Sequence, residues 1–277
     1  MNRPVGADRC PPAHLLRQTL FLALQRAGQL VRENFHHPKK IRYKNNSPIN
    51  LVTWVDQAGD RLIRQTIHRR FPSHDFLTEE SKPTGRGSPY KWIVDPLDGT
   101  TNYAHHFPQV AVSIGLEHEG EICLGGVYDP LREELFWAEK GKGAFLRQKR
   151  HQSRLRVSPT PQLKKSLLLT GFPYDRRERA DLYLSYLKAF MNRIQGIRRA
   201  GAAALDLCWV ACGRVDGYWE WRLKPWDVAA GRLIVEEAGG SLSDFSGRAF
   251  SIYRKQTLAT NGRIHREMLA VMKALSR

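Results

Sequence analysis

The sequence predicts an α+β protein, with an antiparallel sheet in the first half of the chain and a mostly parallel sheet in the second half. Between residues 110 and 146, strand-like segments follow one another through short polar turns, which is typical of an antiparallel meander. After about residue 155, strand-like segments alternate with helical ones, which is typical of parallel strands joined by helices.

The helices are predicted from apolar residues that recur at helical spacing. In the first helix, polar residues such as Arg17 and Gln25 interrupt the apolar stretch 15–31, which predicts an amphipathic helix and not a signal peptide. A later helix begins near Asp227 and ends at Gly239, because Asp favours helix starts and Gly favours helix ends. The predicted helices cover residues 12–35, 56–71, 179–193, 201–213, 226–239 and 262–276.

The strands are predicted from short apolar runs bounded by turn residues. Segments 110–116 and 121–128 form a hairpin through residues 117–120, and the next strands continue the antiparallel order. The strands of the first half cover residues 76–78, 92–94, 110–116, 121–128, 134–138 and 143–146. The strands of the second half cover residues 166–170, 196–199, 217–220, 241–244 and 257–261.

Length and composition fit a globular protein with a large core. The 277 residues are 42% hydrophobic, which suits one domain or two sub-domains that share a core. No apolar run approaches the ~20 residues of a membrane span, so no membrane partner is expected. The cysteines show no Cys-x-x-Cys pair and no His partner at zinc-finger spacing, which favours reduced thiols in a cytoplasmic protein. They are Cys10, Cys123, Cys208 and Cys212.

One segment, residues 92–102, places carboxylates and hydroxyls at the end of an apolar strand. Asp95 stands at the carboxyl end of the strand, a proline fixes the turn, and Asp98 points back to the same place. Oxygen ligands this close in sequence favour a hard cation such as Mg²⁺. Gly99 allows close backbone approach, and residues 100–102 can cap a helix whose N–H groups face an anion. The alternative is that these acids only shape a turn.

Two further acidic motifs lie outside that segment. The run Pro225-Trp226-Asp227 opens the helix that ends in Gly239-Gly240, and Asp227 is either a helix cap or a ligand. Glu79 and Glu80 follow the strand at 76–78, where the alternative is a pair of solvated acids. Each motif alone has a structural explanation, so the interpretation depends on their combination.

In this order, the motifs resemble the signatures of the inositol monophosphatase family: an acidic pair after a strand, then DPxDGTxN, then WDxAAGxxIxxEAGG. Further matches run from Lys44 and residues 51–56 to residues 201–206, so the resemblance covers nearly the whole chain. It implies that family's five-layer αβαβα sandwich as a single domain, residues 1–277, with sub-domains at about 1–155 and 156–277. It also implies a homodimer.

The resemblance implies that carboxylates hold two or three Mg²⁺ ions. Glu79, Asp95 and the backbone carbonyl of Leu97 would hold the first ion. Asp95, Asp98 and Asp227 would hold the second, so that Asp95 bridges the two. Metals about 3.5 to 4 Å apart can clamp the attacking and leaving oxygens of a phosphate ester.

The resemblance also assigns the water and the substrate. Thr100, oriented by Asp56, would position and deprotonate the attacking water, and Glu79 would assist at a weaker third metal. Inhibition by Li⁺ is expected at such a weakly held site. The residues that match phosphate and sugar-ring contacts are Asp98, Gly99, Thr100, Gly201, Ala202, Ala203, Glu220 and Asp227.

Several residues depart from the family pattern or compete for a role. Ala202 stands where many members carry Ser or Thr, and Asn50 replaces an Asp, so substrate preference is open. Trp54 is also unusual, and the sequence does not explain it. His105 and His106 follow the metal turn and are expected to be structural, because a metal can stabilise the leaving oxygen without them.

The net charge of +17 does not follow from phosphatase chemistry. Basic clusters are solvated faces, a field that steers an anionic substrate, or a contact surface for nucleic acid. The last alternative has a family precedent, because SuhB-like bacterial members join ribosomal-RNA transcription complexes. The clusters lie at residues 39–44, 61–70, 147–156, 176–179 and 193–199.

The resemblance therefore implies an enzyme, a Mg²⁺-dependent and Li⁺-sensitive phosphatase that acts on inositol monophosphate or a related small sugar phosphate. Alternative substrates are fructose-1,6-bisphosphate, histidinol phosphate and 3′-phosphoadenosine nucleotides. The alternative from another class is a SuhB-like protein that binds RNA or a transcription complex. The intact acidic set favours the enzyme, since a purely binding protein would not need it.

Overall fold

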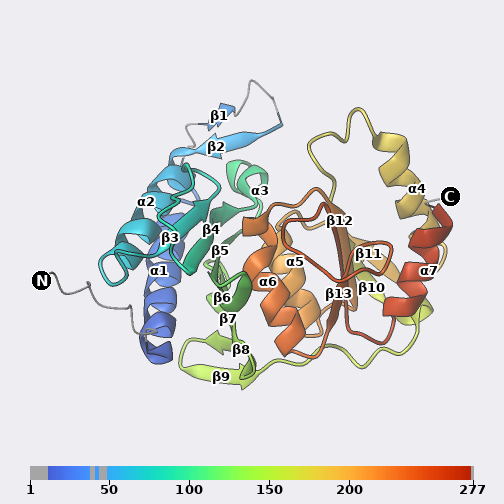
Figure 1. The fold of residues 1–277 in the computed structure, drawn as a ribbon. Coiled ribbons are helices and arrows are strands. Elements are labelled where there is room, and N and C mark those ends of the chain that lie inside the picture. The colour runs from blue at the N-terminus through green and yellow to red at the C-terminus, as the bar shows by residue number, and fades with distance from the viewer. Residues whose placement is uncertain (1–11, 38–40, 44–48, 276–277) are drawn as a thin grey trace, which may run out of the picture.

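The computed structural model describes residues 12–37, 41–43 and 49–275, and this part of the chain forms five alternating layers (Figure 1). A helical layer, a seven-stranded sheet, a second helical layer, a five-stranded sheet and a third helical layer follow one another. The predicted αβαβα sandwich is therefore confirmed. The helical layers are α1 (Ala13–Glu33) with α2 (Trp54–His68), α5 (Ala203–Ala211) with α6 (Pro225–Glu237), and α4 (Ala180–Met191) with α7 (His265–Leu275).

The seven-stranded sheet contains the predicted meander and one pairing that the sequence did not predict. From β4 to β9 all neighbours are antiparallel, whereas β3 lies parallel to β4 at one edge. Residues 79–89 carry the chain back to the start of β4, which makes the parallel pairing possible. The strands in spatial order are β3 (Asp75–Thr78), β4 (Tyr90–Asp98), β5 (Ala111–His118), β6 (Glu121–Asp129), β7 (Glu134–Glu139), β8 (Gly143–Gln148) and β9 (His151–Arg154).

The five-stranded sheet is mostly parallel in strand direction, as predicted. β10 pairs in parallel with β11 and with β12, while β14 is antiparallel to both β12 and β13. Strand β14 is thus the one reversed strand, inserted between two strands that point the same way. The strands in spatial order are β11 (Gly196–Arg198), β10 (Leu167–Thr170), β12 (Gly217–Trp221), β14 (Gln256–Thr260) and β13 (Ser241–Ser243).

Local capping explains where the helices begin. Thr53 accepts a hydrogen bond from Val55 N, and Asp56 accepts one from Thr53 N, so α2 begins at Trp54 and not at the predicted residue 56. Gly201 has a left-handed φ of 86°, which delays the start of α5 to Ala203. The pair β1 (Ile41–Tyr43) and β2 (Leu51–Thr53) was not predicted, nor was strand β9. Helix α3 (Thr100–Ala104) is the helix expected at residues 100–102, with Gly99 and not a hydroxyl side chain at its N-cap.

The central helices α5 and α6 join the two sheets into one buried cluster. Ile93 and Val127 of the first sheet belong to the same cluster as Leu169 and Tyr218 of the second. Separate clusters lie beneath the outer helices, one under α1 and α2 and one under α4 and α7. The close packing of α6 against the first sheet requires small residues, because a Cβ at Gly125 would lie 2.9 Å from the backbone of α6.

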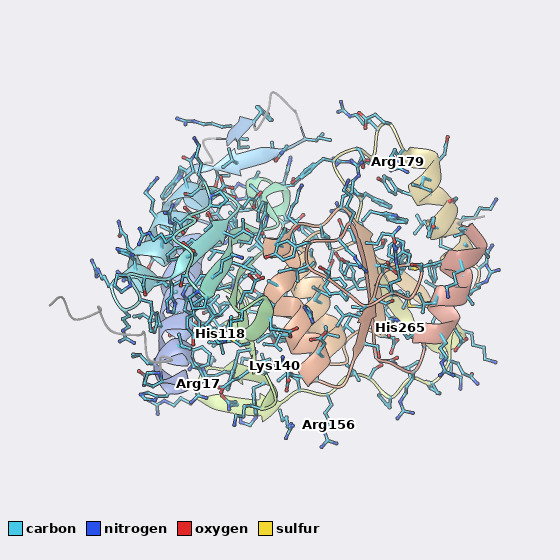
Figure 2. The ribbon with its side chains drawn as sticks, in the orientation of Figure 1. Arg17, His118, Lys140, Arg156, Arg179 and His265 are labelled. Atoms are coloured by element: carbon cyan, nitrogen blue, oxygen red, sulfur yellow. The ribbon has the colours of Figure 1, made fainter. Side chains whose placement is uncertain are left out.

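The described residues contain no membrane-spanning helix and carry basic side chains on several sides (Figure 2). None of the helices in residues 12–37 and 49–275 combines the length and apolar character that a membrane crossing requires. Basic side chains are spread over the molecule: Figure 2 shows Arg17 and Arg156 at its lower end and Arg179 at its upper end. Cys10 and most of the basic cluster at 39–44 lie outside the described residues.

Candidate active site

A cavity of about 640 Å³ opens between the two sheets and collects nearly all of the predicted site residues. They reach it from the residue after β3, the end of β4, the start of α3, the segment that leads into α5, strand β12 and the first turn of α6. The predicted residues that line it are Glu79, Asp95, Leu97, Asp98, Gly99, Thr100, Gly201, Ala203, Glu220 and Asp227. Of the predicted set, Asp56 and Ala202 are fully buried and are not part of the lining.

The parallel pairing of β3 with β4 brings the first acidic residues together. Thr78 lies opposite Val94 in this pairing, and Glu79 N donates a hydrogen bond to Val94 O at 3.2 Å. Glu79 therefore follows β3 at the level where Asp95 stands on β4. Parallel strands end at the same edge of a sheet, so both carboxylates reach the same side of the cavity.

The strand end itself is bent by a register shift between Asp95 and Asp98. Asp95 Oδ1 accepts a hydrogen bond from Leu97 N at 3.0 Å, which holds the turn. Asp98 Oδ2 accepts one from Ala204 N at 2.8 Å, which ties the turn to the first residues of α5. The two carboxylates are thus fixed by different parts of the backbone.

Thr100 and Asp56 form the predicted pair. Thr100 Oγ1 lies 2.9 Å from Asp56 Oδ1 and 3.1 Å from the carbonyl oxygen of Leu97, and its single proton can be donated to either. Asp56 Oδ2 accepts hydrogen bonds from Thr53 N at 2.7 Å and Thr53 Oγ1 at 2.5 Å. Burial raises the pKa of Asp56 to about 6, in spite of these hydrogen bonds.

Asp227 lies in the first turn of α6. Its Oδ2 accepts a hydrogen bond from Lys224 N at 2.7 Å, and Pro225 occupies the first helical position. Asp227 is therefore not the N-cap residue that the sequence suggested but the third residue of the helix. In that position its carboxylate can cap the backbone with one oxygen and still face the cavity.

The electrostatics of the cavity favour a bound cation. Burial, followed by the charges of Glu79, Asp98 and Asp227, raises the pKa of Asp95 well above its ordinary value. Burial also raises the pKa of Asp227 strongly and that of Asp98 to about 7. Four carboxylates in one cavity repel one another when ionised, and a divalent cation would relieve this repulsion.

The hydrogen bonds leave one oxygen of each of three carboxylates open to a cation. They engage Asp95 Oδ1, Asp98 Oδ2 and Asp227 Oδ2, so the second oxygen of each carboxylate can serve a cation. Among the described residues, no group of three or more His, Cys, Asp or Glu side chains is arranged so that it could hold a metal ion by itself. A cation such as Mg²⁺ does not need a complete set of protein ligands, because it keeps several waters and takes one or two carboxylates together with phosphate oxygens.

The opposite wall of the cavity presents Glu220 and the segment before α5. Tyr218 Oη donates a hydrogen bond to Glu220 Oε2 at 2.6 Å, and burial raises the pKa of Glu220 to about 7. Asn102 Nδ2 donates to the carbonyl oxygens of Ala200 at 2.9 Å and Gly201 at 3.2 Å, which fixes this segment to α3. The wall therefore combines a carboxylate with backbone atoms, groups that can form hydrogen bonds with hydroxyls.

The structure adds cationic residues that sequence reasoning missed. Arg176 and Arg199 belong to clusters interpreted as surface charge, yet both line the cavity, as does Lys224. Arg222 Nη1 lies 3.0 Å from Asp175 Oδ2 in an ion pair at the same wall. Only their basic character pointed to them, because the chain topology and not a local motif brings them to the site.

The residues that depart from the family pattern, and the histidines after the metal turn, differ in their position relative to the cavity. Asn50 lines the cavity, which agrees with an effect on substrate preference, whereas Trp54 is 42% exposed at the start of α2. Nothing in the structure explains Trp54. His106 Nδ1 lies 2.7 Å from the carbonyl oxygen of Phe35, as expected of a structural histidine.

Known proteins share both this sequence and this fold. The family model described as the inositol monophosphatase family matches residues 14–276. The Nus factor SuhB of Escherichia coli strain K12 is 40% identical over 252 residues, which are 91% of this chain and 93% of that protein. The inositol-1-monophosphatase of Synechocystis is 45% identical over 226 residues, 81% of this chain and 77% of that protein.

The likeness extends to solved structures. The extragenic suppressor protein suhB from Bartonella henselae superposes with a TM-score of 0.88 at 37% identity, covering 94% of this chain and 98% of that one. Family model, relatives and fold agree with the motifs and with the cavity that they line. The chain therefore belongs to the inositol monophosphatase family.

Proposed function

We propose that this protein is a Mg²⁺-dependent phosphatase that hydrolyses inositol monophosphate or a related small sugar phosphate. The observation that carries the proposal is the convergence of Glu79, Asp95, Asp98 and Asp227 in one cavity, beside the Thr100 hydroxyl. A relative from Synechocystis bears the name inositol-1-monophosphatase, which supports the same substrate class. A single domain over the whole chain is part of this proposal.

The carboxylates would hold two or three Mg²⁺ ions. In this assignment Glu79, Asp95 and the Leu97 carbonyl serve one ion, and Asp95, Asp98 and Asp227 serve another. When bound, the ions supply the positive charge that a phosphate ester needs as its leaving oxygen departs. The backbone of Gly99 and Thr100 would receive the phosphate, since α3 begins there and its first N–H groups are not used within the helix.

The Thr100–Asp56 pair would orient and deprotonate the attacking water. A pKa of about 6 leaves Asp56 largely ionised at neutral pH yet basic enough to receive a proton through Thr100. Asp56 is fully buried, so Thr100 is its connection to the cavity. Glu79 would assist at a weaker third ion.

The second wall would recognise the leaving alcohol. Glu220 can accept hydrogen bonds from hydroxyl groups, while Gly201 and Ala203 allow a ring to approach the backbone. Arg176 and Arg199 add positive charge at the same cavity, which would help to draw in an anionic substrate. Substrates with a second anionic group, such as fructose-1,6-bisphosphate, therefore belong in the test, together with histidinol phosphate and 3′-phosphoadenosine nucleotides.

A phosphate-release panel over these compounds tests the proposal. We expect hydrolysis of inositol 1-phosphate to require added Mg²⁺, to stop with a chelator and to be inhibited by Li⁺ at tens of millimolar, a rough range for an ion this weakly coordinated. Turnover that persists without divalent cations would contradict the metal assignment. Light scattering would test the expected homodimer, and fractionation of cells the expected cytoplasmic location.

A second candidate function is contact with RNA or a transcription complex. The net charge of +17 and the 40% identity to a protein named Nus factor SuhB favour it. The exposed residues Lys149, Arg150 and Arg156 lie at or next to the β8–β9 hairpin and can be replaced by neutral residues. Arg147 is a poorer choice, because its guanidinium lies 4.6 Å from the centre of the Phe21 ring.

The test replaces those three exposed residues with glutamine. If RNA is a partner, the variant should bind structured RNA more weakly and with a shallower dependence on salt than the wild type. Small-substrate hydrolysis should stay near the wild-type rate at moderate salt, since exposed charges beyond about 10 Å are screened from the site. Identical binding curves for both proteins would contradict an RNA role of this hairpin.

A further inference from the structure

Glu220 lies directly beside a glycine of the neighbouring strand. Strands β10 and β12 pair in parallel with Thr170 opposite Trp219, so Gly171 follows at the level of Glu220. Residues opposite one another on adjacent strands point to the same face of a sheet. A Cβ atom added at Gly171 would lie 1.8 Å from Glu220 Oε2 and 2.2 Å from Glu220 Cδ. The carboxylate thus occupies the space that a side chain at position 171 would need.

The backbone conformation at position 171 does not require a glycine. The φ of Gly171 lies outside the left-handed region that favours glycine, unlike that of Gly201 with a φ of 86°. An alanine is therefore compatible with the local chain path. The contact with Glu220 remains as the physical reason why a side chain is not accommodated.

Tyr218 fixes the same carboxylate from the other side. It stands two residues before Glu220 on β12, so both side chains point to the same face of the sheet. Its hydroxyl donates to Glu220 Oε2 at 2.6 Å, and its ring is fully buried in the central cluster. Burial, with the nearby carboxylates of Glu220 and Asp206, raises the pKa of Tyr218, so the phenol keeps the proton that it donates.

We propose that Gly171 and Tyr218 are positioning residues that set the enzyme's preference for hydroxyl-rich leaving alcohols. Gly171 leaves the space and Tyr218 supplies the hydrogen bond that together hold Glu220 against the cavity wall. Held in this way, the carboxylate accepts hydrogen bonds from hydroxyls of a polyol or sugar phosphate. The inference rests on the proposed phosphatase function and identifies two residues outside the cavity lining that govern its selectivity.

The test compares kcat/KM for inositol 1-phosphate with kcat/KM for p-nitrophenyl phosphate, whose leaving group carries no alcohol hydroxyls. Gly171→Ala and Tyr218→Phe should each lower the ratio of the two by about tenfold, the cost of a misplaced charged hydrogen-bond partner. Gly85→Ala is the matched control, because a Cβ at that exposed glycine meets no atom within 4 Å. It should leave the ratio unchanged.

A double-mutant cycle shows whether Gly171 acts through Glu220. Glu220→Ala removes the atoms that an added Cβ would strike, so Gly171→Ala should have no further effect on the ratio in that background. Gly171→Ala should also lower Tm less in the Glu220→Ala background than in the wild type. Additive effects of the two substitutions on both the ratio and Tm would overturn the inference.

The cycle also separates this inference from the proposed function. Wild-type protein that releases no phosphate from either compound would contradict the phosphatase, while the Tm coupling would still test the contact between Gly171 and Glu220. Hydrolysis of both compounds by the wild type, with an unchanged ratio in Gly171→Ala and Tyr218→Phe, would leave the phosphatase in place and overturn the positioning role.

Discussion

The seven-stranded sheet and the five-stranded sheet contribute different kinds of group to one cavity. From the first come Glu79, Asp95 and the Thr100 hydroxyl, which are groups for cations, water and phosphate. From the second come Glu220 and the segment around Gly201, which are groups for hydroxyls and a ring. In the proposed mechanism, most of the chemistry that is common to all phosphate monoesters would thus depend on one sheet, and selectivity would depend on the other.

The junction between the two halves is the pair of central helices. Asp98 of β4 accepts a hydrogen bond from Ala204 of α5, so the turn of the first sheet is anchored on a helix that packs against the second. Asp227 enters from the first turn of α6. A change in the proposed metal-binding set, Asp227 included, should therefore alter rate on every substrate, whereas a change at Glu220 should alter the choice among substrates.

The largest effect is expected from Asp95→Asn. It removes the charge that would bridge two ions, so kcat/KM should fall about a thousandfold or more on every substrate, corresponding to several kcal/mol of transition-state stabilisation. Steady-state phosphate release would measure it. Glu121→Gln is the control, because this acid lies on β6 in an exposed ion pair with Lys140 and should leave the rate unaltered. Near-wild-type turnover in Asp95→Asn would contradict the assignment.

Thr100→Ala should have the next largest effect. Without its hydroxyl, Asp56 loses its connection to the cavity, so kcat should fall about a hundredfold or more while KM changes little. Thr100→Ser keeps a hydroxyl and should restore most of kcat. A rise in KM with kcat unchanged would instead make Thr100 a phosphate ligand only.

The same acids should lower the stability of the metal-free protein. Since burial and mutual repulsion raise the pKa of Asp95 in the folded state, its ionisation is costly there, and metal-free stability should fall as pH rises above about 4. Mg²⁺ should raise Tm at neutral pH, and Asp95→Asn should raise Tm in chelator while reducing the gain from Mg²⁺. A lower Tm for Asp95→Asn in chelator would contradict this account.

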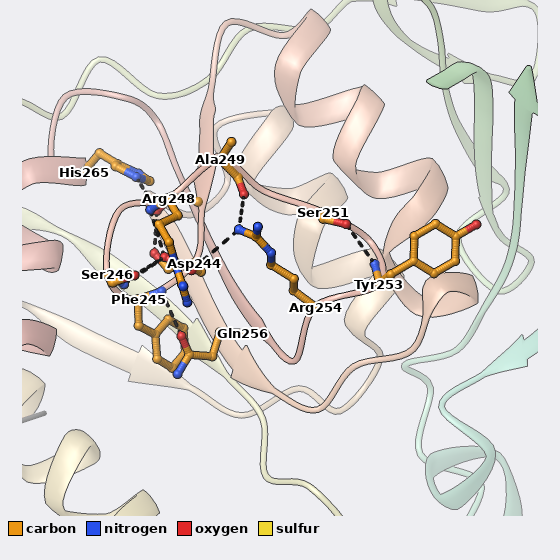
Figure 3. Close-up of polar contacts among 11 residues, drawn as sticks. Asp244, Phe245, Ser246, Arg248, Ala249, Ser251, Tyr253, Arg254, Gln256 and His265 are labelled. Atoms are coloured by element: carbon orange, nitrogen blue, oxygen red, sulfur yellow. Dashed lines mark hydrogen bonds and ion pairs between the residues drawn. The ribbon is translucent and has the colours of Figure 1, made fainter. Parts of the chain in front are cut away.

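Asp244 in the second half is the electrostatic counterpart of these acids. It too is buried, but hydrogen bonds from Ser246 at 2.7 Å and from Arg248 at 2.6 Å outweigh the burial and lower its pKa to about 2 (Figure 3). The ionised Asp244 contributes on the order of 2 kcal/mol to folding stability. This contribution is present above the unfolded pKa of 3.8 and is lost as pH falls through about 2. A buried aspartate thus stabilises the fold at position 244, whereas the buried aspartates of the cavity lower the stability of the metal-free protein.

We therefore expect Asp244→Asn to lower the free energy of unfolding at pH 7 by about 1 to 2 kcal/mol, with little change in activity. Denaturant unfolding of wild type and variant would measure it. The difference between the two proteins should be constant from pH 7 to about 4 and narrow as pH falls from about 4 toward 2, because Asp244 of the unfolded wild type is protonated there while that of the folded protein is still ionised. A difference that stays constant between about pH 4 and pH 2 would show that Asp244 does not act through its charge.

Much of this arrangement could be predicted from the sequence, for identifiable reasons. Amphipathic spacing located the long helices, and the turns at 117–120 located the hairpin between β5 and β6. The motifs around Asp95 and Asp227 named residues that lie in one cavity, because Asp95 stands near the end of β4 and Asp227 in the first turn of α6, and both of these ends face the cavity.

The features that the sequence did not predict depend on pairing between strands that are distant in the chain. The sequence suggested an antiparallel first sheet, but the parallel partner β3 is what brings Glu79 to the level of Asp95. Arg199 was predicted as surface charge, and only the placement of β11 beside β10 brings it to the cavity. Neither pairing leaves a local pattern, since both depend on which strands the core places side by side.

The division of work between the two sheets is tested most directly by one measurement. It is the ratio of kcat/KM for inositol 1-phosphate to kcat/KM for p-nitrophenyl phosphate, in Asp95→Asn and in Glu220→Gln. We predict that Asp95→Asn lowers both values together and keeps the wild-type ratio, whereas Glu220→Gln lowers the ratio about tenfold. A changed ratio in Asp95→Asn, together with an unchanged one in Glu220→Gln, would contradict the account.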